Sequence, residues 1–265
     1  MKPFSSLLCR RTRAVALALL LLGLGPSVAR ALAPGRRVAL EVPEFPECPP
    51  AAVPAPGLPH TAAAMGANRP VLVVAVGSSS TQGWLASDVA HSYPAILQVM
   101  LNLTFPRSDF AVVNRGIGGQ DAAEELARLD TDVLALRPQL VIWQVGANGA
   151  LRDVDPSVFR RLVSSGIAKI KAAGADIILM DNQRTPRMIA APENTRINEA
   201  LASVAVEQGV GLFARSALMD AWAADGRAME EFAASDGLHM NDLGYRCVAH
   251  ALAESIARGL EEVSP

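Results

Sequence analysis

The sequence predicts an α/β protein built on an open, five-stranded parallel sheet with helices on both faces. Two observations carry this prediction: short aliphatic runs, typical of strands buried on both faces, and helical patterns that alternate with them. The runs are residues 71–76, 110–114, 140–145, 177–180 and 210–213. In such a sheet the binding site lies at the carboxyl ends of the strands.

Helices are expected between these strands because apolar residues recur there at three- and four-residue spacing. One helix begins at Asp155-Pro156, where the proline suits the first helical position, and ends at Gly174. Two more helices are marked by apolar stripes: Ile197, Leu201 and Val204, and, after a cap at Asn241, Leu243, Cys247, Leu252 and Ile256.

The first residues have the three-part build of a secretory signal peptide. Basic residues are followed by an apolar run over residues 14–25 and by Ala29-Arg30-Ala31, so we expect a signal peptide over residues 1–31. The run has 12 residues, whereas a membrane span needs about 20. The prediction is a periplasmic or secreted protein with no stable membrane insertion after cleavage. An uncleaved membrane anchor is the alternative.

Charge excludes one class of partner. The whole chain has a formal charge of −2, and removal of residues 1–31 takes away five basic residues and no acidic one, which lowers it to −7. A protein with this charge is not expected to bind nucleic acid or an anionic membrane surface.

Residues 34–59 contain eight prolines, which excludes a regular helix or an inner strand there. We therefore expect an extended arm or linker over residues 32–67 and one domain over residues 68–265. Cys48 and Cys247 remain after cleavage, in a compartment where disulfides persist. Two interpretations stay open: a bridge between them, or a buried Cys247 with a free Cys48.

Hydroxyl residues and glycines follow the first predicted strand, in the segment Gly77-Ser78-Ser79-Ser80-Thr81-Gln82-Gly83. A serine at such a turn can expose its Oγ at the start of a helix, where backbone N–H groups point outward. The segment is therefore a candidate for a nucleophile, with a plain turn as the alternative. A phosphate-binding loop is disfavoured because the pattern lacks its lysine.

Two further strand ends are rich in small residues: Asn114-Arg115-Gly116-Ile117-Gly118-Gly119-Gln120 and Gly146-Ala147-Asn148-Gly149. Three glycines within four positions indicate either a close backbone approach or a tight strand-to-helix turn. Asn148 either presents its amide to a pocket or is a left-handed turn residue.

Asp236 stands three residues before His239, across a turn. This spacing lets the carboxylate meet Nδ1 of the imidazole, which leaves Nε2 as a base. His239 is the best base candidate because His60 lies in the proline-rich segment, His250 lies inside a predicted helix and His91 has no obvious acid partner. A solvated loop histidine is the alternative.

Together, these four strand-end segments resemble the signature blocks of the SGNH hydrolases, also called the GDSL esterase and lipase family. The resemblance covers nearly the whole domain, with the blocks in order. It implies a flavodoxin-like three-layer α/β/α sandwich, which agrees with the pattern of strands and helices. It also implies that Ser79 is the nucleophile and that Asp236 and His239 complete a catalytic triad.

The same resemblance implies an oxyanion hole formed by the backbone N–H groups of Ser79 and Gly119 and by the side-chain amide of Asn148. Two positions depart from the family pattern, because Ser78 and Gly149 stand where aspartates are usual. Neither position has a catalytic role in the family, so we expect activity. A non-catalytic glycan- or ligand-binding relative is the alternative that these departures favour.

The function expected is that of an extracytoplasmic serine esterase acting on O-acyl groups of carbohydrate or on small esters, through an acyl-enzyme on Ser79. An acyltransferase to a sugar acceptor is the alternative within the same chemistry. Trp84 and Arg184 lie near strand ends and are candidate substrate contacts, or else a packed aromatic and a solvated loop arginine. We expect no metal and no organic cofactor, because zinc spacings and a dinucleotide fingerprint are absent from the sequence. The sequence leaves the oligomeric state open.

Overall fold

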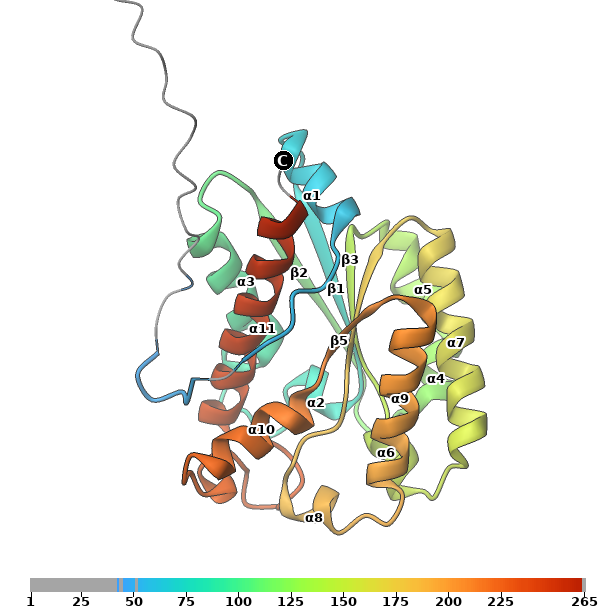
Figure 1. Cartoon of the computed structure of the whole chain (residues 1–265), viewed down its shortest axis with the longest axis vertical. Coiled ribbons are helices and arrows are strands. Elements are labelled where there is room, and N and C mark those ends of the chain that lie inside the picture. Colours follow the sequence, from blue (N-terminus) through green and yellow to red (C-terminus); the bar gives the residue numbers. More distant parts are fainter. Residues whose placement is uncertain (1–41, 43–44, 51, 264–265) are drawn as a thin grey trace, which may run out of the picture. The chain divides into compact units, whose positions relative to one another are not determined.

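The computed structural model describes residue 42, residues 45–50 and residues 52–263, so the predicted signal peptide lies outside the described residues. The centre of the fold is a sheet of five parallel strands in the order β2-β1-β3-β4-β5 (Figure 1). The strands are β1 (Val71–Gly77), β2 (Phe110–Gly116), β3 (Leu140–Gln144), β4 (Asp176–Met180) and β5 (Gly211–Phe213). All five lie on the predicted runs, with ends that shift by no more than two residues.

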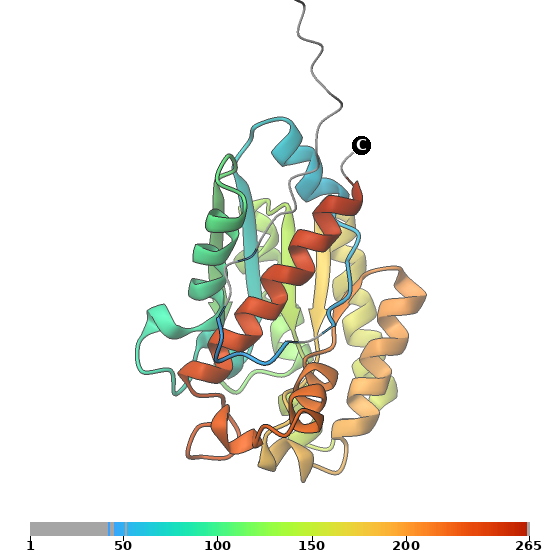
Figure 2. The same ribbon diagram turned by 60° about the vertical axis from the view of Figure 1, so that its left-hand side comes forward.

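Helices cover both faces of this sheet, as the alternation in the sequence predicts (Figures 1 and 2). One face is covered by α1 (Pro59–Gly66), α3 (Tyr93–Thr104), α10 (Arg215–Ala224) and α11 (Asp242–Val263). The other is covered by α4 (Ala122–Ala127), α5 (Leu129–Asp132), α6 (Ala147–Leu151), α7 (Pro156–Ala172), α8 (Pro186–Ile189) and α9 (Asn194–Gln208). The remaining short elements are α2 (Ser79–Gln82) and three 3₁₀ turns, η1 (Val89–His91), η2 (Leu134–Leu136) and η3 (Met229–Glu231).

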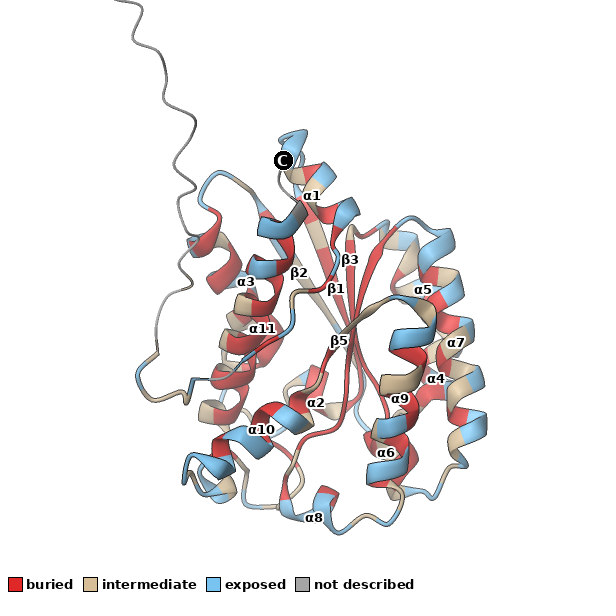
Figure 3. Ribbon diagram, in the orientation of Figure 1, coloured by how far each residue is buried: buried red, intermediate tan, exposed pale blue. Residues whose placement is uncertain are grey.

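Alternate residues of the strands pack in two separate hydrophobic cores, one on each face of the sheet. In β1, Val73 and Ala75 are buried on the α3 and α11 side, whereas Val74 and Val76 are buried on the α7 and α9 side. Figure 3 shows the same division: the central strands β1, β3 and β4 and the inner faces of the helices are mostly buried, the outer faces of the helices are exposed, and the edge strands β2 and β5 are only partly buried. Because successive side chains of a strand point to opposite faces, a strand covered on both sides must be apolar throughout.

The order of the strands reverses at β1. The chain passes from β1 to β2 on one side and then to β3 on the other side. In open parallel sheets this reversal places a binding site outside the carboxyl ends of the two central strands. Here α2 follows β1 and α6 follows β3, so Ser79, the first residue of α2, and Asn148, within α6, both come directly after the carboxyl ends of these two strands. Figure 1 shows α2 and α6 at this end of the sheet.

The described part of the proline-rich segment, expected as an extended arm or linker over residues 32–67, packs on the domain. Leu58 is fully buried, and α1 begins at Pro59, where a missing N–H costs no helical hydrogen bond. The carboxylate of Asp176 accepts hydrogen bonds from the backbone N–H groups of His60 and Thr61, at 3.2 and 2.8 Å. The start of α1 is thereby fixed to the start of β4.

Cys48 and Cys247 form a disulfide, so the first of the two open interpretations is the one that the structure shows. The bridge fixes the segment before α1 to α11. The hydroxyl of Ser255 on α11 also donates to the carbonyl of Pro54, at 2.6 Å, so this segment runs beside α11 (Figure 2). Within the described part of the chain, every helix is too short or too polar to cross a bilayer.

Candidate active site

Ser79, His239 and Asp236 form a continuous hydrogen-bonded line at the carboxyl ends of the strands. Ser79 is the first residue of α2, directly after β1, and His239 lies in the loop before α11. Oγ of Ser79 is 2.8 Å from Nε2 of His239. Nδ1 of His239 is 2.6 Å from Oδ2 of Asp236. The structure thus brings together all three residues proposed from the sequence as a triad, in the order that base catalysis on the serine requires.

The carboxylate of Asp236 is held in its ionised form. Partial burial by itself would raise its pKa, but hydrogen bonds from the backbone N–H groups of His239 and Leu238, both 2.9 Å, and from the imidazole outweigh burial. The pKa of Asp236 therefore lies below its usual value. Because Oδ1 is occupied by the two backbone groups, Oδ2 is free to orient the imidazole.

The loop that carries His239 is fixed to the segment after β4. The carbonyl oxygen of Leu238 accepts hydrogen bonds from the side chains of Gln183 and Thr185, both at 2.8 Å. Gly237 has a positive φ of 66°, which suits glycine at this turn, and its carbonyl accepts from the backbone N–H of Arg187. These contacts, none of which involves Ser79, fix the loop that holds the imidazole beside Ser79.

The turn before Ser79 requires close packing of backbone. A Cβ on Gly77 would lie 2.7 Å from the carbonyl oxygen of Gln144, at the end of the neighbouring strand β3. Oε1 of Gln144 accepts from the backbone N–H and the hydroxyl of Ser78, at 3.2 and 3.3 Å. Ser78, which stands where the family usually has aspartate, thus fixes the turn before Ser79 to the end of β3. Gln144 is a supporting residue that the sequence analysis missed.

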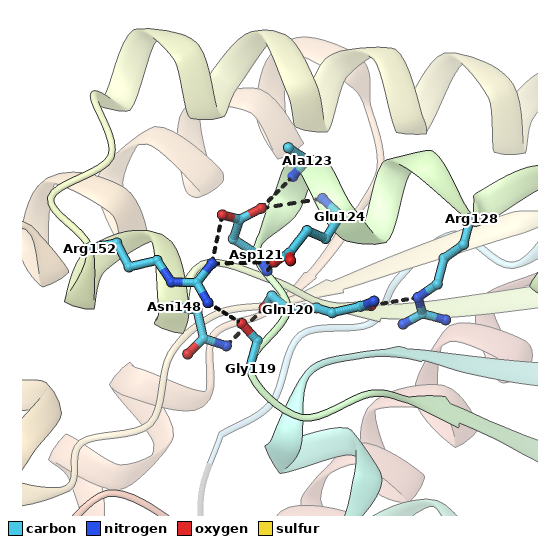
Figure 4. Close-up of polar contacts among 8 residues, drawn as sticks. All are labelled: Gly119, Gln120, Asp121, Ala123, Glu124, Arg128, Asn148 and Arg152. Carbon is cyan, nitrogen blue, oxygen red and sulfur yellow. Dashed lines mark hydrogen bonds and ion pairs between the residues drawn. The ribbon is translucent and has the colours of Figure 1, made fainter.

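The proposed oxyanion donors come from two loops that meet beside Ser79. A Cβ on Gly118 would lie 3.8 Å from Cβ of Ser79, so the glycine loop after β2 adjoins Ser79. Among the described residues, the backbone N–H groups of Ser79 and Gly119 have no hydrogen-bond partner. Nδ2 of Asn148 donates one hydrogen bond to the carbonyl of Gln120, at 2.8 Å (Figure 4). An amide nitrogen has two hydrogens, so a second donor remains.

The two candidate substrate contacts have different surroundings. Trp84 is 53% exposed, and its backbone N–H donates to the carbonyl of Ser79 at 3.0 Å, so it lies beside α2 and is not a buried packing residue. Arg184 donates from Nε to the carboxylate of Asp220 on α10, at 2.7 Å. No contact in the described residues joins Arg184 to Ser79 or His239.

A second group of serine, histidine and aspartate lies near the start of α11. The hydroxyl of Ser87 donates to Oδ2 of Asp242 at 2.5 Å and lies 2.6 Å from Nδ1 of His91. Asp242 is also the acid partner of His91 that the sequence did not reveal, at 3.3 Å. Here the hydroxyl proton goes to the carboxylate and not to the imidazole, so this arrangement is not a triad. The described residues contain no group of three or more His, Cys, Asp and Glu side chains that could hold a metal ion.

The buried pair Asp181 and Arg215 lies behind the site, and the sequence analysis missed both residues. Burial raises the pKa of Asp181 to about 6, although hydrogen bonds from the backbone and hydroxyl of Ser216 oppose it. Nη2 of Arg215 donates at 2.8 Å both to the carbonyl of Asp181 and to Oε1 of Gln183, which in turn holds the histidine loop. Neither residue lies in a sequence motif. Their partners are distant in the chain and meet only in the folded protein, so the sequence analysis had no local signal for them.

The model of the Non-GDSL lipase-like family matches residues 47–262 of this sequence. The chain belongs to this family. The match confirms the resemblance to SGNH and GDSL hydrolases that the motifs indicate, and the family's description suits a first motif that reads Gly77-Ser78-Ser79. The match begins before Cys48, within the segment expected as a linker.

Curated relatives match the chain over less than half of its length. Esterase TesA of Pseudomonas aeruginosa is 32% identical over 112 residues, which are 42% of this chain and 50% of that protein. The arylesterase of Vibrio mimicus is 32% identical over 124 residues, which are 47% of this chain and 60% of that protein. The chain spans between 50% and 60% of the length of these two relatives.

Solved structures resemble this one more widely. A two-domain esterase (CEX) active on acetylated mannans, co-crystallised with mannopentaose, superposes with a TM-score of 0.67 and 22% identity over 80% of this chain and 57% of that chain. The crystal structure of TesA gives a TM-score of 0.58 and 24% identity over 69% of this chain and 97% of that chain. These likenesses confirm the predicted α/β/α fold.

Proposed function

We propose that this protein is an extracytoplasmic serine esterase that hydrolyses carboxylic esters through an acyl-enzyme on Ser79. The observation that carries the proposal is the line from Ser79 Oγ through the His239 imidazole to the Asp236 carboxylate, with distances of 2.8 and 2.6 Å. A hydroxyl is a weak nucleophile unless an oriented base removes its proton, and this geometry supplies one.

In the first step, Oγ of Ser79 attacks the ester carbonyl carbon while Nε2 of His239 accepts the hydroxyl proton. The imidazolium is stabilised by the carboxylate of Asp236, which stays ionised. The bond between the carbonyl carbon and the leaving oxygen then breaks, and His239 returns the proton to the departing alcohol. In the second step, water attacks the acyl group with His239 as base, which releases the carboxylic acid and restores Ser79.

Negative charge develops on the carbonyl oxygen in both steps. The backbone N–H groups of Ser79 and Gly119 are unpaired among the described residues, and Asn148 keeps one amide hydrogen free. Donors that are fixed before the reaction stabilise this charge at no cost of reorganisation. We therefore assign the oxyanion hole to these three groups.

The substrates proposed are small esters or O-acyl groups of carbohydrate. Curated relatives are named esterase and arylesterase, and a structural neighbour is described as active on acetylated mannans. Trp84 and Ile117 are 53% and 42% exposed and flank Ser79, because their backbone N–H groups bond to the carbonyls of Ser79 and Gly77. Their exposed surfaces would pack against the acyl or alcohol part of the ester. Arg184, which pairs with Asp220, stays a weaker candidate.

An extracytoplasmic location is proposed from two features. The first is the basic and apolar start of the chain, which is typical of a signal peptide. The second is the bond between Cys48 and Cys247, because disulfides persist in oxidising compartments and are rare in the cytosol of most organisms.

The deciding experiment is covalent labelling by a fluorophosphonate, which reacts with an activated serine. The wild type should be labelled and Ser79→Ala should not. Ser87→Ala is the matched control, because Ser87 also contacts a histidine and an aspartate, and this variant should label like the wild type. Labelling that persists in Ser79→Ala, or that is absent from the wild type, would overturn the proposal and favour a binding protein.

Substrate class is tested by p-nitrophenyl esters of increasing acyl length beside acetylated xylan. Turnover of short esters or release of acetate supports the proposal, whereas selectivity for long acyl chains contradicts it. Repeating the reaction with a sugar acceptor and analysing the products separates hydrolysis from transfer: an acylated sugar in place of free acid would identify an acyltransferase.

A further inference from the structure

We propose that Arg152 is a positioning residue of the oxyanion hole: its guanidinium holds the loop whose Gly119 N–H binds the developing oxyanion. The inference rests on the proposed esterase function and adds to it a residue that lies in none of the sequence motifs. Four observations carry it: the loop has little internal stiffness, hydrogen bonds fix it before Gly119, hydrogen bonds fix it after Gly119, and two carboxylates orient Arg152.

The loop after β2 has little internal stiffness. Gly118 and Gly119 are consecutive, and Gly119 has a positive φ of 81°, in the region that favours glycine. A Cβ at Gly119 would meet nothing within 4 Å, so neighbouring atoms do not confine this residue by packing. A donor on such a loop is preorganised only if hydrogen bonds on both sides fix the peptide units that flank it.

The side before Gly119 is tied to the nucleophile. The backbone N–H of Gly118 donates to Oε1 of Gln82, on the helix that begins with Ser79, at 2.9 Å. The N–H of Ile117 donates to the carbonyl of Gly77 at 3.0 Å. Both contacts fix the loop relative to the end of β1.

The side after Gly119 is tied to α6. Nη2 of Arg152 donates to the carbonyl of Gly119 at 2.7 Å, and Nδ2 of Asn148 donates to the carbonyl of Gln120 at 2.8 Å (Figure 4). Arg152 follows Asn148 by four residues and its N–H bonds to the Asn148 carbonyl, so one helical turn presents both side chains to two successive carbonyls. The same turn that supplies one oxyanion donor therefore positions the other.

Arg152 is oriented by two carboxylates on α4. Its Nη1 lies 3.0 Å from Oδ2 of Asp121 and 3.3 Å from Oε2 of Glu124, as Figure 4 shows. Asp121 is also the N-cap of α4, where it accepts from the N–H groups of Ala123 and Glu124. Carboxylates on a fixed helix end thus aim the second arm of the guanidinium at Gly119.

The contacts of Arg152 indicate that it affects the catalytic rate more than the free energy of folding. The Arg152 side chain is 49% exposed, and ion pairs with that exposure add little to the free energy of folding. A donor that moves by about 1 Å, however, can cost on the order of 100-fold in rate. Removal of the guanidinium should therefore lower kcat about 10- to 100-fold, less than the effect of about 100- to 1,000-fold for a donor lost outright.

The test compares Arg152→Met with Arg160→Met in the mature protein, with a p-nitrophenyl ester as substrate. Arg160 is the matched control because it makes a comparable exposed ion pair, with Glu207, between α7 and α9. Arg152→Met should lower kcat with KM within about twofold, and Arg160→Met should change neither, since an interaction made only in the transition state appears in kcat. Unchanged kcat in Arg152→Met would overturn the inference.

Two further variants guard against a simple folding defect. Arg152→Lys keeps a charge for Asp121 and Glu124, but one ammonium group lacks the planar fork that reaches Gly119 as well, so kcat should still fall. Arg152→Ala should regain part of its kcat on addition of methylguanidinium, which does not repair a misfolded protein. Wild-type kcat in Arg152→Lys, or no rescue of Arg152→Ala, would contradict the inference.

A measurement without substrate separates this inference from the proposed function. Amide hydrogen exchange by NMR should be faster in Arg152→Met than in the wild type at Gln120, whose backbone N–H donates to the carbonyl of Ile117 across the loop, and unchanged in Arg160→Met. If the wild type fails to react with a fluorophosphonate, the esterase proposal is overturned, and a changed exchange still shows that Arg152 orders the loop. If the wild type reacts and exchange is unchanged, only the role of Arg152 is wrong.

Discussion

Oγ of Ser79 lies 2.8 Å from Nε2 of His239, although 160 positions separate the two residues in the chain. The contact arises because Ser79 follows the central strand β1, while the loop before α11 is fixed to the segment after β4 through Leu238. The two residues are thus positioned by different parts of the sheet edge.

Asp236→Asn should lower kcat by about 10,000-fold, because an amide orients the wrong tautomer of the imidazole and does not stabilise its charged form. Oδ1 would still accept from the backbone of Leu238 and His239, so the loop should keep its shape. Asp242→Asn is the control, since Asp242 contacts His91 outside the triad. Steady-state kinetics of both variants check the prediction, and equal losses in the two would contradict it.

Asn148→Ala should lower kcat about 100- to 1,000-fold, because it removes a proposed oxyanion donor and the bond to the Gln120 carbonyl. The effect should appear in turnover and not in KM. Asn148→Asp, which replaces a donor by a negative charge, should be slower still. An increase in KM alone would show that Asn148 contacts the substrate in the ground state instead.

Gly116→Ala should destabilise the fold by about 1–3 kcal/mol, the usual cost of overpacking. A methyl group at this position would overlap the backbone of Thr81 and Gln82, so β2 and the helix of Ser79 must separate. Gly66→Ala at the end of α1 is the control, because its Cβ would meet nothing within 4 Å. Urea unfolding measures both, and similar midpoints would show that the site accommodates the methyl group.

Asp181 should make the protein less stable as the pH rises. Its pKa is raised from 3.8 to about 6 by burial, so the folded state keeps a proton that the unfolded state has lost. The contribution of Asp181 to the free energy of unfolding is full below about pH 4, falls as the pH rises to about 6 and is lost above that pH. The free energy of unfolding should differ by about 3 kcal/mol between these two limits. The melting temperature of Asp181→Asn should therefore increase relative to that of the wild type as the pH rises over this range. Parallel pH profiles would mean that the pKa of Asp181 is not raised.

Removal of the disulfide with Cys48→Ser/Cys247→Ser should cost about 2–5 kcal/mol, because the bridge closes a loop across 199 positions and restricts the unfolded chain. The melting temperature of the wild type should fall to that of the variant in the presence of a reductant. The variant itself should not respond to the reductant, which serves as the control. A wild type that melts at the same temperature with and without reductant would argue against the contribution.

Local patterns predicted most of the architecture. The five strands lie where aliphatic runs stand, and α7 begins at Pro156 as the proline and the apolar spacing predict. These features are legible because a strand covered on both faces must be apolar at every position and a helix start needs particular residues. The strand-end motifs also singled out Ser79 and His239 as the residues to bring together, and their catalytic roles stay predictions.

The sequence by itself determined where the five strands, α7, α9 and α11 form and which residues follow the strand ends, because these features depend on neighbours within a few positions. Only the tertiary structure decided that Cys48 pairs with Cys247, that α1 packs on the domain, and that Arg152 meets the carbonyl of Gly119. Such contacts depend on which loops come together and on where a long side chain finds its partner. A surface arginine has the same local sequence signal whether it holds a catalytic loop or faces water.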